Sequence, residues 1–447
     1  MRERAESLTR QLLAWPSVTG SDGERAFAGR LQALLAAWPY FRAHPEHLWL
    51  EDAGDGRSTV CALVRGAGDA AAVLAGHYDV VGVEDFGDLA PLAGDPDALR
   101  PRLIERVDAR AAQDVASPDW MPGRGALDMK SGLAAALAVL EQWTSHPRGS
   151  VLFVACPDEE AHSAGARAAN RVFARVAAEH GLRFALGISQ DVVTDATAGE
   201  YGRQVFCGAV GKVLLCAKVR GAPAHAGEPL AGLSAHALAA EVVRAIEGNA
   251  GWAGAGFDDP SLPPPILLRG GDTKTAYDVT MPQDVLLLFN LILREASPAA
   301  ALDRFAERVM EALEVGRARW PGDKPPLTVT RGDVPESDGD PVALADAALV
   351  PAGPGAVVAL GSVRYAPVPF ADEALRAQLT GAAGDIRVGG PYPHVSDISF
   401  LDDGTFPWIN AGPWGRDFHQ LAERVHTGYA FGELPDLLER LLESVLG

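Results

Sequence analysis

Residues that can do chemistry follow five apolar stretches of this 447-residue chain, and each stretch ends near a histidine or a carboxylate. The first leads into AGHYDVVG, in which His77 and Asp79 are two residues apart. In extended backbone, residues i and i+2 face the same side, so His77 can bind a metal ion while Asp79 orients its ring. By itself, so short a pattern favours a histidine at a strand end beside a solvated aspartate.

Two further stretches lead into acidic residues. GRGALDMKSG places Asp128 among glycines just before an amphipathic helix, a position that also suits a helix N-cap. CPDEEAHSAGA follows a buried strand with three consecutive carboxylates, which include Glu159 and Glu160. Taken alone, this run favours a solvated helix start, where acids stabilise the helix dipole. Its position favours a ligand site, because open α/β sheets bind ligands at the carboxyl ends of their strands.

The last two stretches supply Asp191 and His419. Asp191 follows the strand RFALGIS, and His419 follows a strand and a Gly/Pro turn in INAGPWGRDFHQLAERVH, at the start of a helix-like stretch. Imidazole and carboxylate ligands without cysteine suit zinc, manganese or cobalt. Two histidines and further acids that share one carboxylate have the composition of a two-metal hydrolytic centre.

The elements that must position these residues alternate between helix and strand. Periodicity predicts helices at about 4–15, 22–38 and 129–143. Four apolar stretches read as buried strands: Ser58–Arg65, Ala71–Gly76, Ser150–Cys156 and Arg183–Ser189. This alternation predicts an α/β domain with a mostly parallel sheet and helices on both faces. Segment 84–120 is rich in Asp, Pro and Ala without a strong period, so we expect a long excursion near the site.

A second domain is expected from Gly208 onward. Strand and helix patterns there follow the order β-α-β-β-α-β, which is the ferredoxin-like split motif. We therefore predict a catalytic domain in two segments, 1–207 and 333–447, with a lid and dimerisation domain inserted at 208–332. A strand at 355–363 is assigned to the second catalytic segment.

Bulk properties exclude several classes of protein. The net charge of −20 and the pI near 4.9 repel phosphate backbones, so no nucleic-acid partner is expected. No run of 18 apolar residues occurs, which predicts no membrane span, and the charged N-terminus lacks a signal core, which predicts a cytoplasmic protein. The four cysteines are scattered without a CxxC pair, which predicts reduced core residues.

Five motifs, in the order GHYDVV, GRGALDMKSG, DEEAHSAGA, KVRGAPAHAGEPLAGLSA and GPWGRDFHQLAERV, carry a family resemblance. The chain resembles the metallopeptidase family of aminoacylase, carboxypeptidase G, peptidase T and succinyl-diaminopimelate desuccinylase over nearly its whole length. Within that family it is most similar to the arginine-utilisation protein branch. The resemblance implies a hydrolase that cleaves an amide bond in an N-acyl amino acid, a dipeptide or a related small amide, with a place in arginine catabolism.

The resemblance also implies a metal centre. His77 and Asp191 would bind one divalent ion, Glu160 and His419 would bind a second, and Asp128 would bridge the two. Zinc is the expected metal, with cobalt or manganese as alternatives.

The same resemblance implies three catalytic residues. Glu159 would be the general base, Asp79 would orient His77, and His225 would reach the active site of a partner subunit in a homodimer that forms through the lid domain. An alternative for His225 is a solvated histidine in a strand-to-helix turn.

The chain departs from the family pattern at one substrate-binding motif. Many members carry Asp-x-Arg on a lid strand, where this chain has Asn290 and Ile292, so a carboxypeptidase-like specificity is not supported. Two other readings stay open: a catalytically silent, metal-binding relative that acts as a ligand-sensing or interaction protein, and a one-metal exopeptidase.

Overall fold

The computed structural model describes residues 1–447 except 194–202, 250–262, 295, 338–339 and 394–395. Contacts divide the chain into two compact units. Unit 1 comprises Met1–Ala209, Phe370–Tyr392 and Ser396–Gly447, and unit 2 comprises Val210–Pro369 and Pro393–Val395. Among the described helices, none combines the length and the apolar content that crossing a bilayer requires.

Unit 1 is built on an eight-stranded sheet with the order β1-β2-β5-β3-β6-β14-β7-β13. Its strands are β1 (Leu48–Gly54), β2 (Arg57–Val64), β3 (Ala70–His77), β5 (Ser150–Cys156), β6 (Arg183–Ser189), β7 (Gln204–Cys207), β13 (Arg387–Gly389) and β14 (Trp408–Asn410). Strands β5, β3, β6 and β14 run parallel to one another, as do β7 and β13. The pairs β1–β2, β2–β5 and β14–β7 are antiparallel. The predicted α/β class with a mostly parallel sheet is therefore confirmed.

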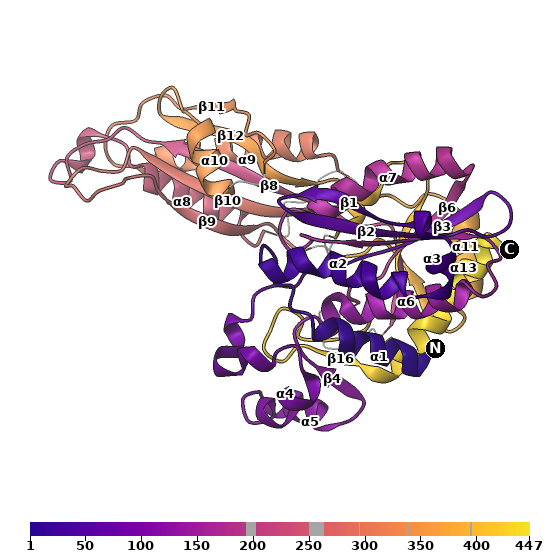
Figure 1. The fold of residues 1–447 in the computed structure, drawn as a ribbon. Coiled ribbons are helices and arrows are strands. Elements are labelled where there is room, and N and C mark those ends of the chain that lie inside the picture. The colour runs from indigo at the N-terminus through magenta and orange to yellow at the C-terminus, as the bar shows by residue number, and fades with distance from the viewer. Residues whose placement is uncertain (194–202, 250–262, 295, 338–339, 394–395) are drawn as a thin grey trace. The chain divides into compact units, whose positions relative to one another are not determined.

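Helices cover both faces of this sheet (Figure 1). They are α1 (Arg2–Leu13), α2 (Asp22–Ala36), α3 (Pro39–Ala43), α6 (Ser131–Trp143), α7 (Ala164–His180), α11 (Glu373–Ala383), α12 (Ile398–Leu401) and α13 (Leu434–Leu446). Figure 1 shows α7 on one side of the sheet and α1 and α6 on the other. Because successive side chains of a strand face opposite sides, Ala72 and Leu74 of β3 join the core shared with α1, α6 and α13. Helix cover on both faces explains why the interior residues of β3 and β5 are apolar.

Segment 84–120, which we call the insertion, contains helices that the sequence, without a strong period there, did not predict. It contains η2 (Glu84–Leu92), α4 (Pro96–Leu103) and α5 (Ala109–Ala116), and it ends in β4 (Trp120–Pro122). It has a small apolar core of its own: Phe86, Leu89, Ala93, Leu99, Leu103 and Val115. Helices α4 and α5 are only eight residues long, and prolines interrupt the segment, so no periodic pattern could develop.

A three-stranded sheet connects the insertion to the C-terminal part of unit 1. Strand β4 pairs with β16 (Arg424–His426), which pairs with β15 (Gly415–Arg416). The residues between β15 and β16 form turns, so the helix-like stretch predicted to begin at His419 is wrong. Asp417 and His419 adopt left-handed φ angles of 55° and 60°, which a right-handed helix does not allow.

Unit 2 contains a five-stranded sheet with the order β11-β12-β8-β10-β9. Its elements are β8 (Gly211–Arg220), α8 (Ala235–Ile246), β9 (Ile266–Asp272), β10 (Asp284–Leu293), α9 (Pro298–Arg319), β11 (Thr328–Arg331), α10 (Pro341–Ala348) and β12 (Gly355–Tyr365). The predicted β-α-β-β-α-β elements occur in order as β8 to β11. However, β12 pairs antiparallel with β8, and β11 pairs parallel with β12 at the edge. Unit 2 therefore extends to Pro369, whereas the sequence placed the domain boundary at 332 and assigned the β12 segment to the catalytic domain.

Candidate metal centre

The candidate ligands lie at the carboxyl ends of neighbouring parallel strands. His77 is the last residue of β3, whose neighbours in the sheet are β5 and β6. Glu159 and Glu160 follow β5, and Asp191 follows β6. Because parallel strands end at the same edge of a sheet, these side chains meet although they are distant in sequence.

Two ligands reach the same edge from outside the sheet. Asp128 lies in η3 (Ala126–Lys130), immediately before α6, and His419 lies in the loop between β15 and β16. The loop between these two strands turns back on itself, which brings His419 to the sheet edge. The centre therefore draws on five separate segments of unit 1.

Asp128 lies between the two histidines and directs one carboxylate oxygen to each. Its Oδ1 is 3.0 Å from His77 Nε2, and its Oδ2 is 3.1 Å from His419 Nε2. Asp191 Oδ1 is 3.8 Å from His77 Nε2, and Glu160 Oε1 is 3.0 Å from His419 Nε2. The donor atoms thus form two groups that share Asp128, and within each group they lie within 4.8 Å of one another. We call His77–Asp128–Asp191 the first group and Asp128–Glu160–His419 the second group.

Asp79 is fully buried and connects the end of β3 to the turn after β5. Its Oδ1 accepts the backbone N–H of Glu159 at 3.1 Å, and its Oδ2 accepts that of Glu160 at 3.2 Å. The His77 Nδ1 lies 3.0 Å from the Asp79 carbonyl oxygen but 3.6 Å from Oδ1. The backbone carbonyl of Asp79 therefore orients His77 more directly than the carboxylate that the sequence singled out.

Glu159 belongs to neither of the two groups that share Asp128. Its Oε2 is 3.9 Å from His77 Nε2, and its side chain is 12% exposed. It also forms a third possible ligand group with His77 and Glu160. This position is compatible with a base beside the metal centre, as the sequence predicted, and also with a ligand.

The electrostatics of the centre show an excess of acid over base. Burial, together with the charge of Asp128, raises the pKa of Glu160 to about 7. Burial also raises the pKa of Asp191 and Glu159. Burial lowers the pKa of His419, but the carboxylates of Asp128 and Glu160 outweigh it and raise that pKa to about 10. Crowded carboxylates of this kind are stabilised by bound cations.

The donor set fits two divalent ions. It contains only imidazole nitrogens and carboxylate oxygens, which suit zinc, manganese or cobalt. All four cysteines are buried and free, and none belongs to a candidate ligand group. The sharing of Asp128 between the two groups is the arrangement that a pair of bridged ions requires.

Two charged residues behind the centre were not identified from the sequence. Glu423 is fully buried, and its Oε1 accepts the backbone N–H groups of Leu127 at 3.1 Å and Asp128 at 3.3 Å. Its Oε2 pairs with Arg124 Nη1 at 2.6 Å. Arg124 lies in the motif GRGALDMKSG with Asp128, and Glu423 lies in the motif GPWGRDFHQLAERV with His419. A further charged residue in each of these two motifs was the sequence signal that could have identified them.

His225 lies in unit 2, after β8, and its side chain is exposed. Its Nδ1 accepts the backbone N–H of Gly227 at 3.0 Å, and His225 forms an isolated antiparallel bridge with Thr280. Its action across a dimer interface stays a prediction.

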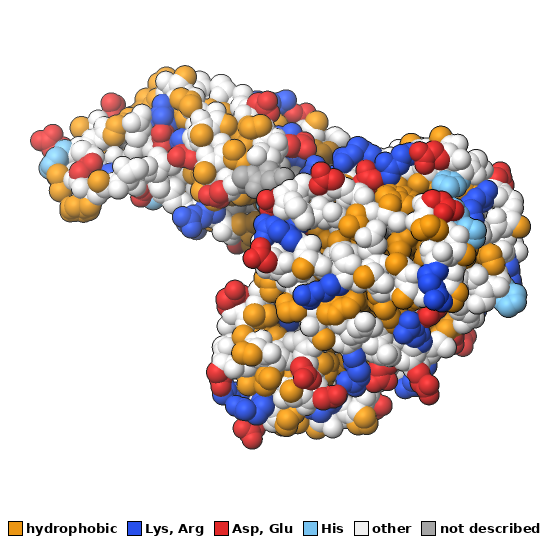
Figure 2. Space-filling model, viewed as in Figure 1, with side chains coloured by type: hydrophobic (Ala, Val, Ile, Leu, Met, Phe, Trp, Pro, Cys, Tyr) orange, Lys and Arg blue, Asp and Glu red, His pale blue; other side chains and the backbone are white. Residues whose placement is uncertain are grey.

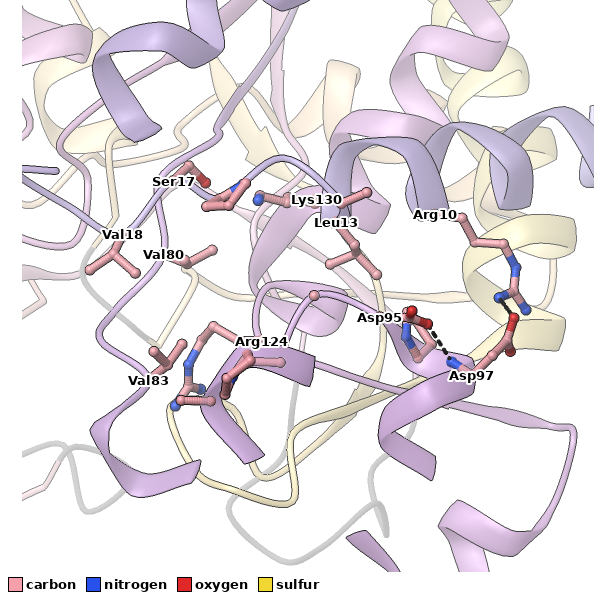
Figure 3. A pocket seen from close by; sticks show the side chains of 17 residues that line it. Arg10, Leu13, Ser17, Val18, Val80, Val83, Asp95, Asp97, Arg124 and Lys130 are labelled. Carbon is pink, nitrogen blue, oxygen red and sulfur yellow. Dashed lines mark hydrogen bonds and ion pairs between the residues drawn. The ribbon is translucent and has the colours of Figure 1, made fainter. Parts of the chain in front are cut away.

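A pocket of about 580 Å³ lies in unit 1 (Figure 3). Its walls come from α1, the segments after α1 and β3, and the insertion, and none of the candidate metal ligands lines it. Lys130 and Arg124 line this pocket. Lys130 is buried, its Nζ donates to the carbonyl of Trp15 at 2.8 Å, and burial lowers its pKa to about 7. The pocket is thus separate from the ligand groups, although Lys130 follows Asp128 by two residues.

The α/β fold with this site places the chain in a known class of metallopeptidase. The chain belongs to peptidase family M20/M25/M40, whose model matches residues 73–443. It is 32% identical to the uncharacterized protein YqjN of Bacillus subtilis over 313 residues and 31% identical to the protein RocB of the same organism over 319 residues. Each alignment covers 69% of this chain but only 57% and 56% of those proteins, so the chain spans little more than half the length of these relatives.

Solved structures share the fold. A tripeptidase from Staphylococcus aureus superposes with a TM-score of 0.63 at 18% identity, and the match covers 100% of this chain and 99% of that one. A dinuclear metal binding peptidase of the M20 family from Bacillus subtilis superposes with a TM-score of 0.57 at 11% identity, with coverage of 98% and 97%. The family resemblance drawn from the five motifs is therefore confirmed.

Proposed function

We propose that this protein is a two-metal hydrolase that cleaves an amide bond in a small substrate, such as an N-acyl amino acid or a dipeptide. The observation that carries the proposal is the position of Asp128, which directs one oxygen to His77 and the other to His419. Membership of a peptidase family and the fold shared with a dinuclear metal binding peptidase support it.

The first group would hold one divalent ion and the second group the other, with zinc as the preferred metal and cobalt or manganese as alternatives. When bound, such ions polarise the scissile carbonyl and lower the pKa of water to about 7. The residues of the chain then have to orient these ions and move the proton.

Glu159 is proposed as the group that moves the proton. Its carboxylate lies beside the first group and outside the two groups that share Asp128. It accepts a proton from the attacking water and passes this proton to the nitrogen of the leaving amine. Asp79 keeps His77 in place and fixes the turn that carries Glu159.

Oxyanion stabilisation is proposed to come from His225 of a second subunit. An imidazole that donates a hydrogen bond to the developing oxyanion lowers the barrier to amide cleavage. This part of the proposal requires a homodimer that forms through unit 2. The motifs that resemble the arginine-utilisation protein branch of the family support amino-acid catabolism, and arginine catabolism in particular, as the physiological setting.

Metal analysis combined with hydrolysis tests the proposal. The purified chain should contain two divalent ions and hydrolyse at least one member of a panel of N-acyl amino acids, dipeptides, and ureido or guanidino amides. Removal of the ions with a chelator should abolish turnover, and zinc should restore it. One bound ion in an active protein would indicate a one-metal exopeptidase, and two ions without hydrolysis would indicate a catalytically silent relative.

A further inference from the structure

We propose that the insertion holds the second group in place, and that Asp85 and Asp114 are positioning residues for the metal ion that Asp128 and His419 bind. The inference rests on the proposed two-metal function and assigns a role to segment 84–120. The insertion supplies none of the ligands, but it contacts both loops that carry these two ligands.

The first connection runs from the insertion to the backbone of Asp128. Asp85 binds Arg124 Nη2 through both carboxylate oxygens, at 2.9 and 3.0 Å. Arg124 binds Glu423 at 2.6 Å, and Glu423 accepts the backbone N–H of Asp128 at 3.3 Å. Arg124 and Glu423 are almost completely buried, so water screens their pairing little, whereas the side chain of Asp85 is 34% exposed and its contact with Arg124 is partly screened.

The second connection runs from the insertion to the two strands that flank His419. The Oδ2 atom of Asp114, on α5, accepts from Arg416 Nη1 at 2.6 Å and from Arg424 Nε and Nη2 at 2.9 and 2.7 Å. Arg416 lies in β15 and Arg424 in β16. Arg424 is fully buried and also pairs with Asp417 inside the loop. One carboxylate of the insertion thus fixes both ends of the His419 loop.

Apolar packing adds a third connection. Leu421, inside the His419 loop, packs against the apolar core of the insertion. The guanidinium groups of Arg416 and Arg424 lie 4.7 and 5.5 Å from the ring of Trp120, which begins β4. The loop is therefore held at both ends by charge and in its middle by apolar contact.

The His419 loop depends on such contacts because its local conformation is unfavourable. Asp417 and His419 both adopt left-handed φ angles, which are unfavourable for residues other than glycine. A metal ligand also has to be held to within about 0.5 Å of its productive position. His77 and Asp191 need no comparable support, because His77 ends the central strand β3 and Asp191 follows the central strand β6 by two residues. Loss of the Asp114 contacts should therefore affect the second group selectively, whereas loss of the Asp85 contact acts through Asp128, which both groups share, and should affect both.

Zinc titration of the full-length chain tests this selectivity. The metal-free protein is titrated with zinc against a chromogenic chelator, and a His419→Ala variant identifies which binding event belongs to the second group. Asp114→Asn should weaken that event about 10- to 100-fold, which is typical for loss of a group that orients a metal ligand, and leave the other within about two-fold. Asp85→Asn should weaken both events, because Asp128 belongs to both groups. Asp85→Glu keeps the carboxylate and should restore most of the affinity.

Asp88→Asn is the matched control, because Asp88 lies in the same insertion but pairs with Arg106 at an exposed position. It should leave both zinc affinities unchanged. Thermal melting of each metal-free variant separates a selective loss of zinc affinity from general unfolding. Substitution of Asp85, whose side chain is 34% exposed, is the milder perturbation of the fold. If the wild type binds fewer than two zinc ions, the proposed function itself is wrong. If the wild type binds two and Asp114→Asn weakens both events equally or neither, the insertion does not position the second group. If Asp85→Asn weakens neither event, Asp85 does not position Asp128.

Discussion

Replacement of Glu423 by glutamine perturbs the buried charge pair behind the metal centre with almost no change in shape. The side chain is fully buried, it pairs with Arg124 at 2.6 Å, and it accepts two backbone N–H groups. Glutamine keeps one oxygen acceptor for these N–H groups but removes the negative charge. The NH₂ group of the glutamine also faces either Arg124 or the two backbone N–H groups, and none of these can accept a hydrogen bond.

The expected loss in the free energy of unfolding depends on which partners Arg124 keeps after the substitution. Removal of one partner from a buried pair costs about 3–5 kcal/mol, because it leaves an uncompensated buried charge. Asp85 still binds Arg124 through both oxygens and Gly82 accepts from its Nε, which compensates part of this charge. We therefore expect Glu423→Gln to lower the free energy of unfolding of the metal-free chain by about 2–4 kcal/mol, near the lower end of that range.

Urea unfolding of the metal-free protein measures this loss, with Glu141→Gln as the control. Glu141 pairs with Arg4 at the same distance of 2.6 Å, but both side chains are more than a third exposed. An exposed pair is worth about 0–1 kcal/mol, so the control should change the free energy of unfolding little. Equal losses in the two variants, or a loss below about 1 kcal/mol in Glu423→Gln, would refute the reasoning that burial makes this pair costly to break.

Four further predictions test the centre, the dimer and the packing of unit 1. Glu159→Gln should retain both ions and lower turnover at least 10²–10⁴-fold, as the loss of general base catalysis requires, and near-normal turnover in a fully metallated variant would contradict the assignment. Asp128→Asn should preserve the fold by circular dichroism but reduce the affinity for both ions together, whereas two tightly bound ions would show that Asp128 does not bridge them. His225→Ala and Glu159→Gln should each be nearly inactive. Mixing the two variants under demonstrated subunit exchange should recover about a quarter of wild-type activity, because about half of the dimers then contain one complete site. Activity that stays at background excludes action of His225 across the interface. Burial raises the pKa of Glu24 from its ordinary 4.5 to about 7, so the native chain keeps a proton that the unfolded chain releases, and stability falls as the pH rises between these values. In urea unfolding, the free energy of unfolding of Glu24→Gln should therefore rise relative to that of the wild type by about 2–3 kcal/mol between pH 5 and pH 8. A difference between the two proteins that does not change with pH would contradict this.

The candidate ligands at strand ends could be predicted from sequence because each follows a strongly patterned element. Apolar runs such as those before His77 and Asp191 are recognisable locally, and their carboxyl ends must meet at one edge of a parallel sheet. The same local patterns predicted the α/β class and the order of elements in unit 2 up to β11. Family motifs then divided the ligands between two groups, and the distances around Asp128 are consistent with that division.

Pairings between distant residues could not be predicted in this way. Arg124 and Glu423 are 299 residues apart, and nothing in either motif distinguishes a buried charge from a solvated one. Likewise β12 joins the sheet of unit 2 across a long connection, so its sequence alone did not indicate which domain it belongs to.

The sequence by itself determined which residues can bind metal and which strands present them, since both depend on residue type and on the short-range periodicity of the backbone. Only the tertiary structure decided that the insertion folds into short helices, that Asp85 and Asp114 face the two ligand loops, and that His419 lies in a left-handed turn and not in a helix. These features depend on contacts between segments that are far apart in the chain. Their energies come from burial and charge pairing in three dimensions, which local sequence patterns do not encode.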